Sequence, residues 1–270
     1  PEKTDVKPLV TVKNVKYRTL QLAKKNENGE QVVATLTITG TSDSGATVNE
    51  TVDTKTEGYA EVELPAGTYT VAETHVNDVE LSTAEKAYFS IINDNTTVAF
   101  GATEAVKTLT FENPGKGTLT LTKQDDTEEP MEGVQFQLHF KAFANASDLS
   151  ATTAPAANTV TGDVNEQTGV TVSQDDLTTD AEGKITLENL VPGWYKLTEL
   201  EGDANENHVL ADPVVIKVTA SNFGTALGNA SATVTNTRMG YLNVEKAWDG
   251  GFADSFNASE QEVTFKAYSD

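Results

Sequence analysis

The stretch AEGKITLENLVPGWYKLTEL, residues 181–200, shows the fold class of this chain most clearly. Apolar and polar residues alternate on both sides of a Pro-Gly turn, which is the pattern of two short β-strands with one buried face each. Similar short runs, separated by clusters of Gly, Asn and Asp, recur along the 270 residues, and helical periodicity is weak. Short strands at this spacing predict an all-β protein built from β-sandwiches.

The same stretch has a counterpart earlier in the chain. TEGYAEVELPAGTYTVAET, residues 56–74, aligns with residues 181–200, and the segments before and after each copy align as well. A repeat on this scale predicts tandem domains of one fold. We expect the first domain to span residues 1–114, with residues 1–18 as a leading segment, and the second to span residues 115–239.

Two segments depart from this simple repeat. The second copy contains an extra segment near residues 141–180, rich in Ala, Thr, Asn and Asp, which we expect to form an insertion loop. One short helix within residues 141–160 is the alternative. A third copy begins with GYLNVEKAWDGG at residue 240, and the printed sequence ends before the rest of the repeat. Residues 240–270 are therefore expected to be the start of a truncated third domain.

The second copy places a Lys, a Glu and an Asn where apolar side chains belong. Side chains two residues apart along a strand lie on the same face of a sheet. Lys123 is in step with two leucines, Glu199 with a tyrosine and a leucine, and Asn236 with a valine. The face that is buried by its apolar residues should therefore also bury these three polar side chains.

The first copy repeats this order with Lys24, Glu73 and Asn113, each again in step with apolar neighbours. One such coincidence would mean little, but the same order in two aligned copies is a pattern. The lysine position of the first copy has alternatives, because Lys16 is also in phase and Lys25 is adjacent. For any single Lys–Glu pair, an ordinary salt bridge is the competing interpretation.

The composition argues against several classes of function. With 41 acidic and 19 basic residues, the net charge of −22 opposes binding to nucleic acids and to anionic membranes. The three histidines are scattered without metal-ligand spacing, and the absence of cysteine excludes disulfides and thiol chemistry. We therefore expect no bound metal, no cofactor, no membrane partner and no conventional enzyme active site.

The motifs LTLTK, GVQFQL, TDAEGKITLENLVPGWYKLTELE and VTNT resemble the Cna B-type domains of Gram-positive surface adhesins and pilins, also called SpaA-like or prealbumin-like domains. The resemblance is close over residues 115–239 and fair over residues 19–114, and over residues 240–270 it covers only the opening of such a domain. It implies tandem immunoglobulin-like β-sandwiches. It also implies a spontaneous isopeptide bond in each domain, between a first-strand Lys and a last-strand Asn, with help from an acidic residue.

The resemblance assigns these roles to particular positions. In the order Lys, Glu and Asn, they are Lys123, Glu199 and Asn236 in the second domain and Lys24, Glu73 and Asn113 in the first. The two glutamates take the catalytic role, and the lysines and asparagines form the cross-links. Lys246 would be the lysine of an incomplete third site.

Burial makes this chemistry feasible without an enzyme. A buried lysine has its pKa lowered by up to about 3–5 units, which frees the nucleophilic amine. A buried carboxyl has its pKa raised, so it can donate a hydrogen bond to the amide oxygen and shuttle protons while ammonia leaves. The fold supplies proximity, and effective molarities of about 10⁵ M or more make an amide a workable target.

The resemblance implies a structural stalk or shaft segment of an adhesin or pilin, stabilised against force and proteolysis. Such a protein would be extracellular and anchored to the cell wall, with its signal peptide and anchor outside this sequence. It would be a monomer unless a sortase assembles it, and its self-directed, single-turnover reaction would not make it an enzyme. The alternative is a ligand-binding adhesin region, in which residues 141–180 recognise a host matrix protein or glycan.

Overall fold

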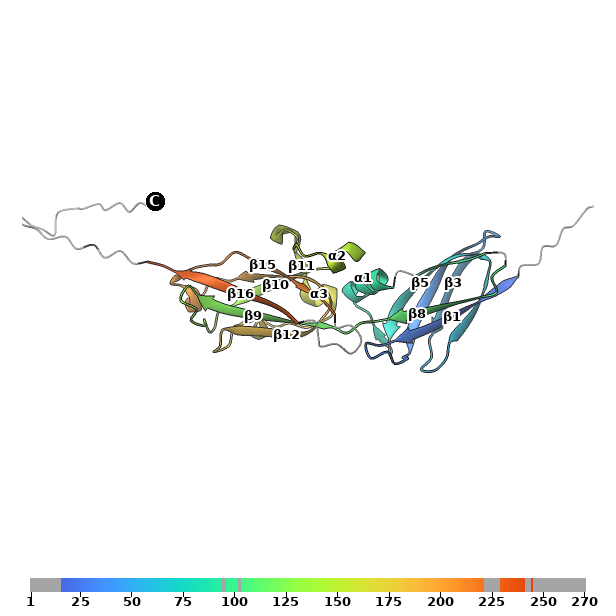
Figure 1. The fold of residues 1–270 in the computed structure, drawn as a ribbon, viewed down its shortest axis with the longest axis horizontal. Helices are drawn as coiled ribbons and strands as arrows, with labels where there is room; N and C mark the ends of the chain where they lie inside the picture. The colour runs from blue at the N-terminus through green and yellow to red at the C-terminus, as the bar shows by residue number, and fades with distance from the viewer. Residues whose placement is uncertain (1–15, 94–95, 102, 221–228, 241–243, 245–270) are drawn as a thin grey trace, which may run out of the picture. The chain divides into compact units, whose positions relative to one another are not determined.

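The computed structural model describes residues 16–93, 96–101, 103–220, 229–240 and 244. These residues form two β-sandwiches, one for each full copy of the repeat (Figure 1). Both belong to one compact unit that ends at Arg238. The expected third domain falls almost entirely outside the described residues, and Lys246 is among the positions that are not described.

The first sandwich contains eight strands among its described residues. They are β1 (Tyr17–Lys25), β2 (Ala34–Ser42), β3 (Thr47–Asp53), β4 (Ala60–Pro65), β5 (Gly67–Val76), β6 (Val79–Glu80), β7 (Thr97–Phe100) and β8 (Val106–Glu112). One sheet has the order β4-β1-β8, and the other has the order β3-β2-β5-β6 with β7 also paired to β5. Helix α1 (Thr83–Ile92) connects β6 to β7.

The second sandwich repeats this plan with eight strands among its described residues. They are β9 (Gly117–Asp125), β10 (Phe136–Lys141), β11 (Gly162–Asp163), β12 (Lys184–Leu190), β13 (Gly193–Glu199), β14 (His208–Val209), β15 (Val214–Val218) and β16 (Asn229–Arg238). Its sheets have the orders β12-β9-β16-β14 and β11-β10-β13-β15. The predicted all-β sandwich class is confirmed.

The first and last strands of each sandwich are parallel neighbours in one sheet, whereas the other strand pairs are antiparallel. In β1 and β8, Lys24 lies opposite Phe111, and in β9 and β16, Lys123 lies opposite Val234. In both copies the asparagine follows two residues beyond the lysine's partner. Because side chains alternate along a strand, the lysine and the asparagine share one face at the same end of the pair.

The two cores bury equivalent tyrosines. Tyr69 and Tyr195 are fully inaccessible to solvent and belong to the main apolar clusters of their sandwiches. The hydroxyl of Tyr69 donates to the carbonyl of Pro65 at 2.7 Å, and that of Tyr195 donates to Val191 at 2.8 Å. Each large ring therefore fills the core without leaving its hydroxyl unpaired, which would be costly there.

Helix α1 was not expected from the weak helical periodicity. Its start is fixed by a capping box, in which the Ser82 hydroxyl accepts from the Glu85 N–H at 3.2 Å and the Glu85 carboxylate accepts from the Ser82 N–H at 2.8 Å. Helix α1 continues the first sandwich but packs toward the second, since Tyr88 lies 6.2 Å from the Phe143 ring. Lys116 forms an ion pair with Glu85 at 3.1 Å on the same side.

The insertion near residues 141–180 is more structured than the favoured insertion loop, and α2 (Ala146–Ser150) lies within the range of the alternative short helix. This segment contains short helical elements, namely α2 (Ala146–Ser150), η1 (Ala157–Thr159), α3 (Val164–Thr168) and η2 (Asp175–Leu177). A further turn, η3 (Asp203–Asn205), follows β13. Side-chain caps from Asn145 and Asp163 begin α2 and α3, and Val164 and Leu177 are buried in the core. Caps and a few buried side chains stabilise helices too short to show a period.

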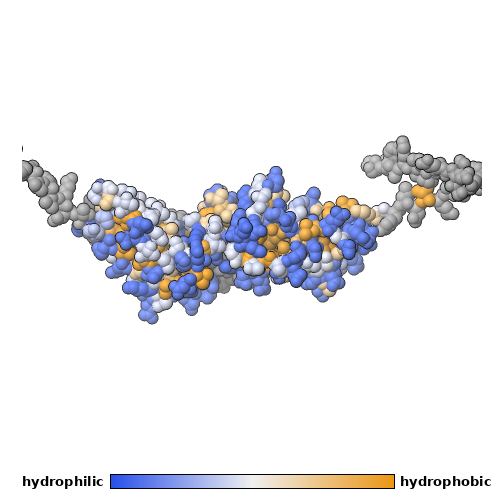
Figure 2. All heavy atoms as spheres, turned by 180° about the vertical axis from the view of Figure 1, so that it is seen from behind, coloured by the Kyte–Doolittle hydropathy of each residue, from blue (hydrophilic) through white to orange (hydrophobic). Residues whose placement is uncertain are grey.

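The visible surface is mostly polar. Figure 2 shows hydrophilic residues over most of the visible face, interrupted by smaller apolar areas. Within the described residues, no helix is both long enough and apolar enough to cross a lipid bilayer.

Replacing Ser82 with Ala should destabilise the protein by about 1 kcal/mol, because α1 loses the side-chain acceptor at its N-terminus. Urea denaturation would measure this loss in the free energy of unfolding. Ser90→Ala is the matched control, since Ser90 is exposed in the last turn of α1 and should change stability by less than about 0.5 kcal/mol. Equal stabilities of the two variants would contradict the capping role.

Candidate functional site

The six residues singled out by the repeat form two buried clusters, one in each sandwich. All six are less than a tenth exposed, and they are Lys24, Glu73 and Asn113 in the first cluster and Lys123, Glu199 and Asn236 in the second. Each cluster takes its lysine from the first strand, its glutamate from the strand of the opposite sheet that carries the buried tyrosine, and its asparagine from the end of the last strand or the residue after it. The fold therefore brings together what the sequence keeps far apart.

In the second cluster, Lys123 is completely buried. Its Nζ donates to the carbonyl of Gln124 at 3.1 Å and contacts Sδ of Met131 at 3.3 Å. It also lies 3.9 Å from Oε1 of Glu199. Burial lowers the pKa of Lys123, and attraction to Glu199 and Asp125 opposes this only in part.

Asn236 contacts Glu199 through its nitrogen. Its Nδ2 donates to Oε1 of Glu199 at 2.5 Å, while its Oδ1 accepts from the backbone N–H of Ala211 at 3.1 Å. The expectation that the glutamate would hydrogen-bond the amide oxygen is therefore wrong for this site, because Ala211 offers a fixed donor to that oxygen. As a result, Oε1 of Glu199 lies 3.9 Å from the amine of Lys123 and accepts from the amide nitrogen of Asn236.

Two further groups at this site were missed by the sequence reasoning. Asn205 is only 2% exposed, and its Nδ2 donates to Oε1 of Glu199 at 2.9 Å and to the carbonyl of Leu200 at 2.8 Å. The N–H of Ala211 also donates to Oε2 of Glu199 at 3.2 Å. Both groups lie in the irregular chain after β13, where no periodic pattern marks a residue as buried.

The first cluster has fewer hydrogen bonds among the described residues. Lys24 is completely buried, with its Nζ 3.4 Å from Oε1 of Glu73 and 5.4 Å from the centre of the Phe89 ring on α1. Burial lowers the pKa of Lys24 to about 8 despite the attraction of Glu73. Burial also raises the pKa of Glu73, against the opposing influence of Lys24 and then Asn113.

Hydrogen bonding distinguishes the two clusters. Asn113 lies close enough to Glu73 to affect its pKa, yet among the described residues neither Glu73 oxygen nor Oδ1 of Asn113 has a contact with hydrogen-bond geometry. The structure also distinguishes the three candidate lysines of the first domain. Lys16 is exposed, and Lys25 is partly exposed and 3.9 Å from Glu112, which leaves Lys24 as the buried one of the three.

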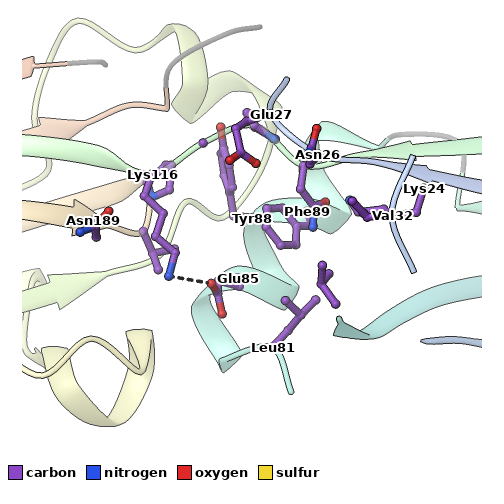
Figure 3. A pocket seen from close by; sticks show the side chains of 16 residues that line it. Lys24, Asn26, Glu27, Val32, Leu81, Glu85, Tyr88, Phe89, Lys116 and Asn189 are labelled. Carbon is purple, nitrogen blue, oxygen red and sulfur yellow. Dashed lines mark ion pairs between the residues drawn. The ribbon is translucent and has the colours of Figure 1, made fainter. Parts of the chain in front are cut away.

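The first cluster borders a cavity of about 380 Å³. Figure 3 shows Lys24 on one side of it and the Lys116–Glu85 ion pair on the other, with Tyr88 and Phe89 of α1 between them in this view. The cavity thus lies where α1 approaches the second sandwich. No group of three potential metal-binding side chains occurs among the residues described in the structure.

A charged pair joins the same two strands just beyond the second cluster. Asp125 follows Lys123 by two residues on β9, and Arg238 follows Asn236 by two on β16. Arg238 donates to Oδ2 of Asp125 through Nε at 2.8 Å and also through Nη2, and Thr127 donates to Oδ1. Burial alone would raise the pKa of Asp125, but these hydrogen bonds outweigh it and hold that pKa well below its usual range.

The fold and these clusters define a class of protein: tandem β-sandwiches whose first and last strands meet at a buried Lys–Glu–Asn cluster. Residues 18–105 and 117–241 match the family model described as SpaA, prealbumin-like fold domain. These matches cover most of the chain, so the chain belongs to this family, as its motifs indicated.

Several solved pilin structures are similar to the chain. A streptococcal ancillary pilin has 17% identity and a TM-score of 0.44, with 88% of this chain and 68% of the pilin covered. The minor pilin of Streptococcus agalactiae has 16% identity and a TM-score of 0.45, with 85% and 100% covered. The shaft pilin SpaA of Lactobacillus rhamnosus GG has 15% identity and a TM-score of 0.34, with 84% and 100% covered. No curated protein matches the chain.

Replacing Asp125 with Asn should lower the melting temperature at pH 7, because the pair between β9 and β16 is lost. A carboxyl with a depressed folded-state pKa stabilises the fold above its unfolded pKa of about 3.9 and loses that effect as the pH falls further. The gap between wild type and variant should therefore narrow below about pH 4. Calorimetry across pH would test this, with Asp126→Asn as the control, since Asp126 lies 3.8 Å from Arg238 but is exposed. A gap that does not change with pH would contradict the assignment.

Proposed function

We propose that this chain is a stalk segment of a Gram-positive surface adhesin or pilin, and that each sandwich is closed by a self-formed isopeptide bond. The cross-links join Lys24 to Asn113, assisted by Glu73, and Lys123 to Asn236, assisted by Glu199. The observation that carries the proposal is the complete burial of Lys123 beside a glutamate that is itself hydrogen-bonded to Asn236. Membership of the prealbumin-like family supports a structural role, and anchoring to the cell wall is part of the proposal.

The reaction can be written with the atoms at the second cluster. The lone pair of Lys123 Nζ attacks Cγ of Asn236, a C–N bond forms, and the carbonyl π electrons move to Oδ1. Glu199 accepts a proton from Nζ and passes one to Nδ2, which the same carboxylate oxygen contacts at 2.5 Å. The C=O bond re-forms as the Cγ–Nδ2 bond breaks. The products are a secondary amide and one molecule of ammonia.

Formation of the isopeptide bond also removes the free-energy cost of a buried ammonium group. A buried ammonium is costly unless it is well paired, and Nζ of Lys24 has no contact of hydrogen-bond geometry among the described residues. A neutral amide carries no such cost. Each bond also closes a loop that takes in nearly a whole sandwich, which in the chain-entropy model stabilises the folded state by about 4–5 kcal/mol.

The strand arrangement determines what the bond does under tension. In each sandwich the chain enters along the first strand and leaves along the last, and these two strands are parallel neighbours. Pulling the ends of a sandwich apart therefore loads this one pair of strands. A covalent link near their shared end transmits the load directly, so the strands in between do not have to separate.

The insertion near residues 141–180 fits a structural role better than recognition of a ligand. Its large apolar side chains are turned inward, with Phe143, Val160 and Val164 each less than 5% exposed. Buried anchors of this kind are unavailable for contact with a partner, whose binding energy would need exposed aromatic or charged residues.

The intact mass of the denatured protein should be lower than the sequence mass by two molecules of ammonia. Lys123→Ala should restore one of them beyond the mass change of the substitution, and should destabilise the second sandwich by at least about 4–5 kcal/mol. Lys25→Ala is the control, because Lys25 is partly exposed and should leave both losses in place. A wild-type mass equal to the sequence mass would refute the proposal.

Stretching single molecules should distinguish a domain held by the Lys123–Asn236 cross-link from one held by non-covalent contacts alone. The wild-type second sandwich should release no large length at forces that unfold unbonded domains. In Lys123→Ala, unfolding should release about 350–400 Å, since roughly 110 residues extend at about 3.3–3.6 Å each. The same release in wild type and variant would show that Lys123 carries no load across the sandwich.

A further inference from the structure

We infer that the chain between β13 and β15 completes the reaction site of the second sandwich. The backbone N–H of Ala211 stabilises the negative charge that develops on Oδ1 of Asn236, and Asn205 is a positioning residue that holds Glu199. This inference rests on the proposed cross-link between Lys123 and Asn236. It adds two groups that neither the repeat nor the family resemblance indicates.

The N–H of Ala211 has two effects on Asn236. It lies 3.1 Å from Oδ1, the atom that receives the carbonyl electrons when the amine attacks, so its hydrogen bond strengthens as the charge develops. It also fixes which way the amide faces. With Oδ1 held by Ala211, Nδ2 must face Glu199, which places the leaving nitrogen against the group that protonates it.

Two backbone groups hold the side chain of Asn205, the residue that positions Glu199. The N–H of Gly202 donates to its Oδ1 at 2.8 Å, and its Nδ2 donates to the carbonyl of Leu200. These two backbone partners fix the orientation of its amide, so Nδ2 must also face Oε1 of Glu199 at 2.9 Å. That is the oxygen which contacts both Lys123 and Asn236. Asn205 therefore sets the position of the atom that transfers the proton.

The first sandwich offers an internal comparison. Among its described residues, no donor of hydrogen-bond geometry reaches Oδ1 of Asn113 or either oxygen of Glu73. Its amine is instead covered by the ring of Phe89. The two sites thus share their reactants but differ in the groups around them, and the second bond should form faster than the first.

The first test is the rate of bond formation in Asn205→Ala. The full chain would be synthesised in a cell-free system, quenched in acid at intervals and digested, and the two cross-linked peptides quantified by mass spectrometry. Loss of a hydrogen bond to the carboxylate should slow the Lys123–Asn236 bond roughly 10- to 100-fold and leave the Lys24–Asn113 bond unchanged. Asn207→Ala, an exposed change in the same segment, should alter neither rate. An unchanged second bond in Asn205→Ala would overturn the positioning role.

The second test uses Asn205→Asp, which keeps the volume of the side chain and its acceptor for Gly202 but removes the donor to Glu199. Formation of the second bond should be slow at pH 7. Its rate relative to wild type should recover toward acidic pH, as the new carboxyl takes up a proton and donates again. A purely structural defect would slow the bond by the same factor at every pH, and that result would contradict the inference. If Asn205→Ala does not fold, this variant still tests whether Asn205 positions Glu199.

The third test removes the Ala211 donor alone. Replacing Ala211 with lactic acid converts the amide to an ester and removes the N–H that donates to Oδ1 of Asn236 and to Oε2 of Glu199. Loss of such a donor should slow the second bond about 10²- to 10³-fold. A rate equal to wild type would remove Ala211 from the mechanism.

The possible outcomes distinguish failure of this inference from failure of the proposed Lys123–Asn236 cross-link. If the wild-type chain never forms the Lys123–Asn236 peptide, the proposed function itself fails. If wild type forms it and all three altered chains form it at the same rate, only the inference fails. Near-UV circular dichroism of each chain, together with the intact first cross-link, would show that the altered chains are folded.

Discussion

The structure depends on two lysines that are buried completely beside a carboxylate and a carboxamide. An ammonium group in a protein interior is costly, and a single carboxylate at 3.4–3.9 Å offsets that cost only in part. The lowered pKa values of Lys24 and Lys123 express this imbalance. A lowered pKa increases the fraction of each lysine that is a neutral, nucleophilic amine. The same burial that makes the charge unfavourable makes the nucleophile available.

The topology determines what the proposed cross-links would do under tension. Lysine and asparagine meet because the first and last strands of each sandwich run parallel and side by side, with the asparagine two residues beyond the lysine's partner. Any other strand pairing would place the cluster where a cross-link bypasses only part of the domain. In the second sandwich, Asp125 and Arg238 also join these two strands, two residues after Lys123 and Asn236 respectively. The ion pair helps to keep the register that the cluster needs.

The two sites solve the problem of an isolated polar cluster in different ways. In the first, α1 covers the amine with the Phe89 ring, and the glutamate and asparagine are left with few polar neighbours. In the second, Asn205 and the Ala211 N–H supply donors to the carboxylate and to the amide oxygen. Burial shifts the pKa values of both lysines, whereas fixed donors define the geometry of the second site. The repeat preserves the Lys, Glu and Asn, whereas the segments between the strands differ.

The sequence by itself determined the features that depend on period and order. Alternation along the strands predicted the sandwiches. The same two-residue period determines which face of a strand a side chain occupies, and it therefore identified Lys123, Glu199 and Asn236 as buried polar residues. Only the tertiary structure decided the rest. The orientation of the Asn236 amide and the donors Asn205 and Ala211 depend on contacts between segments with no periodic signal. Their roles follow from which backbone groups the folded chain brings near, and no local pattern encodes that.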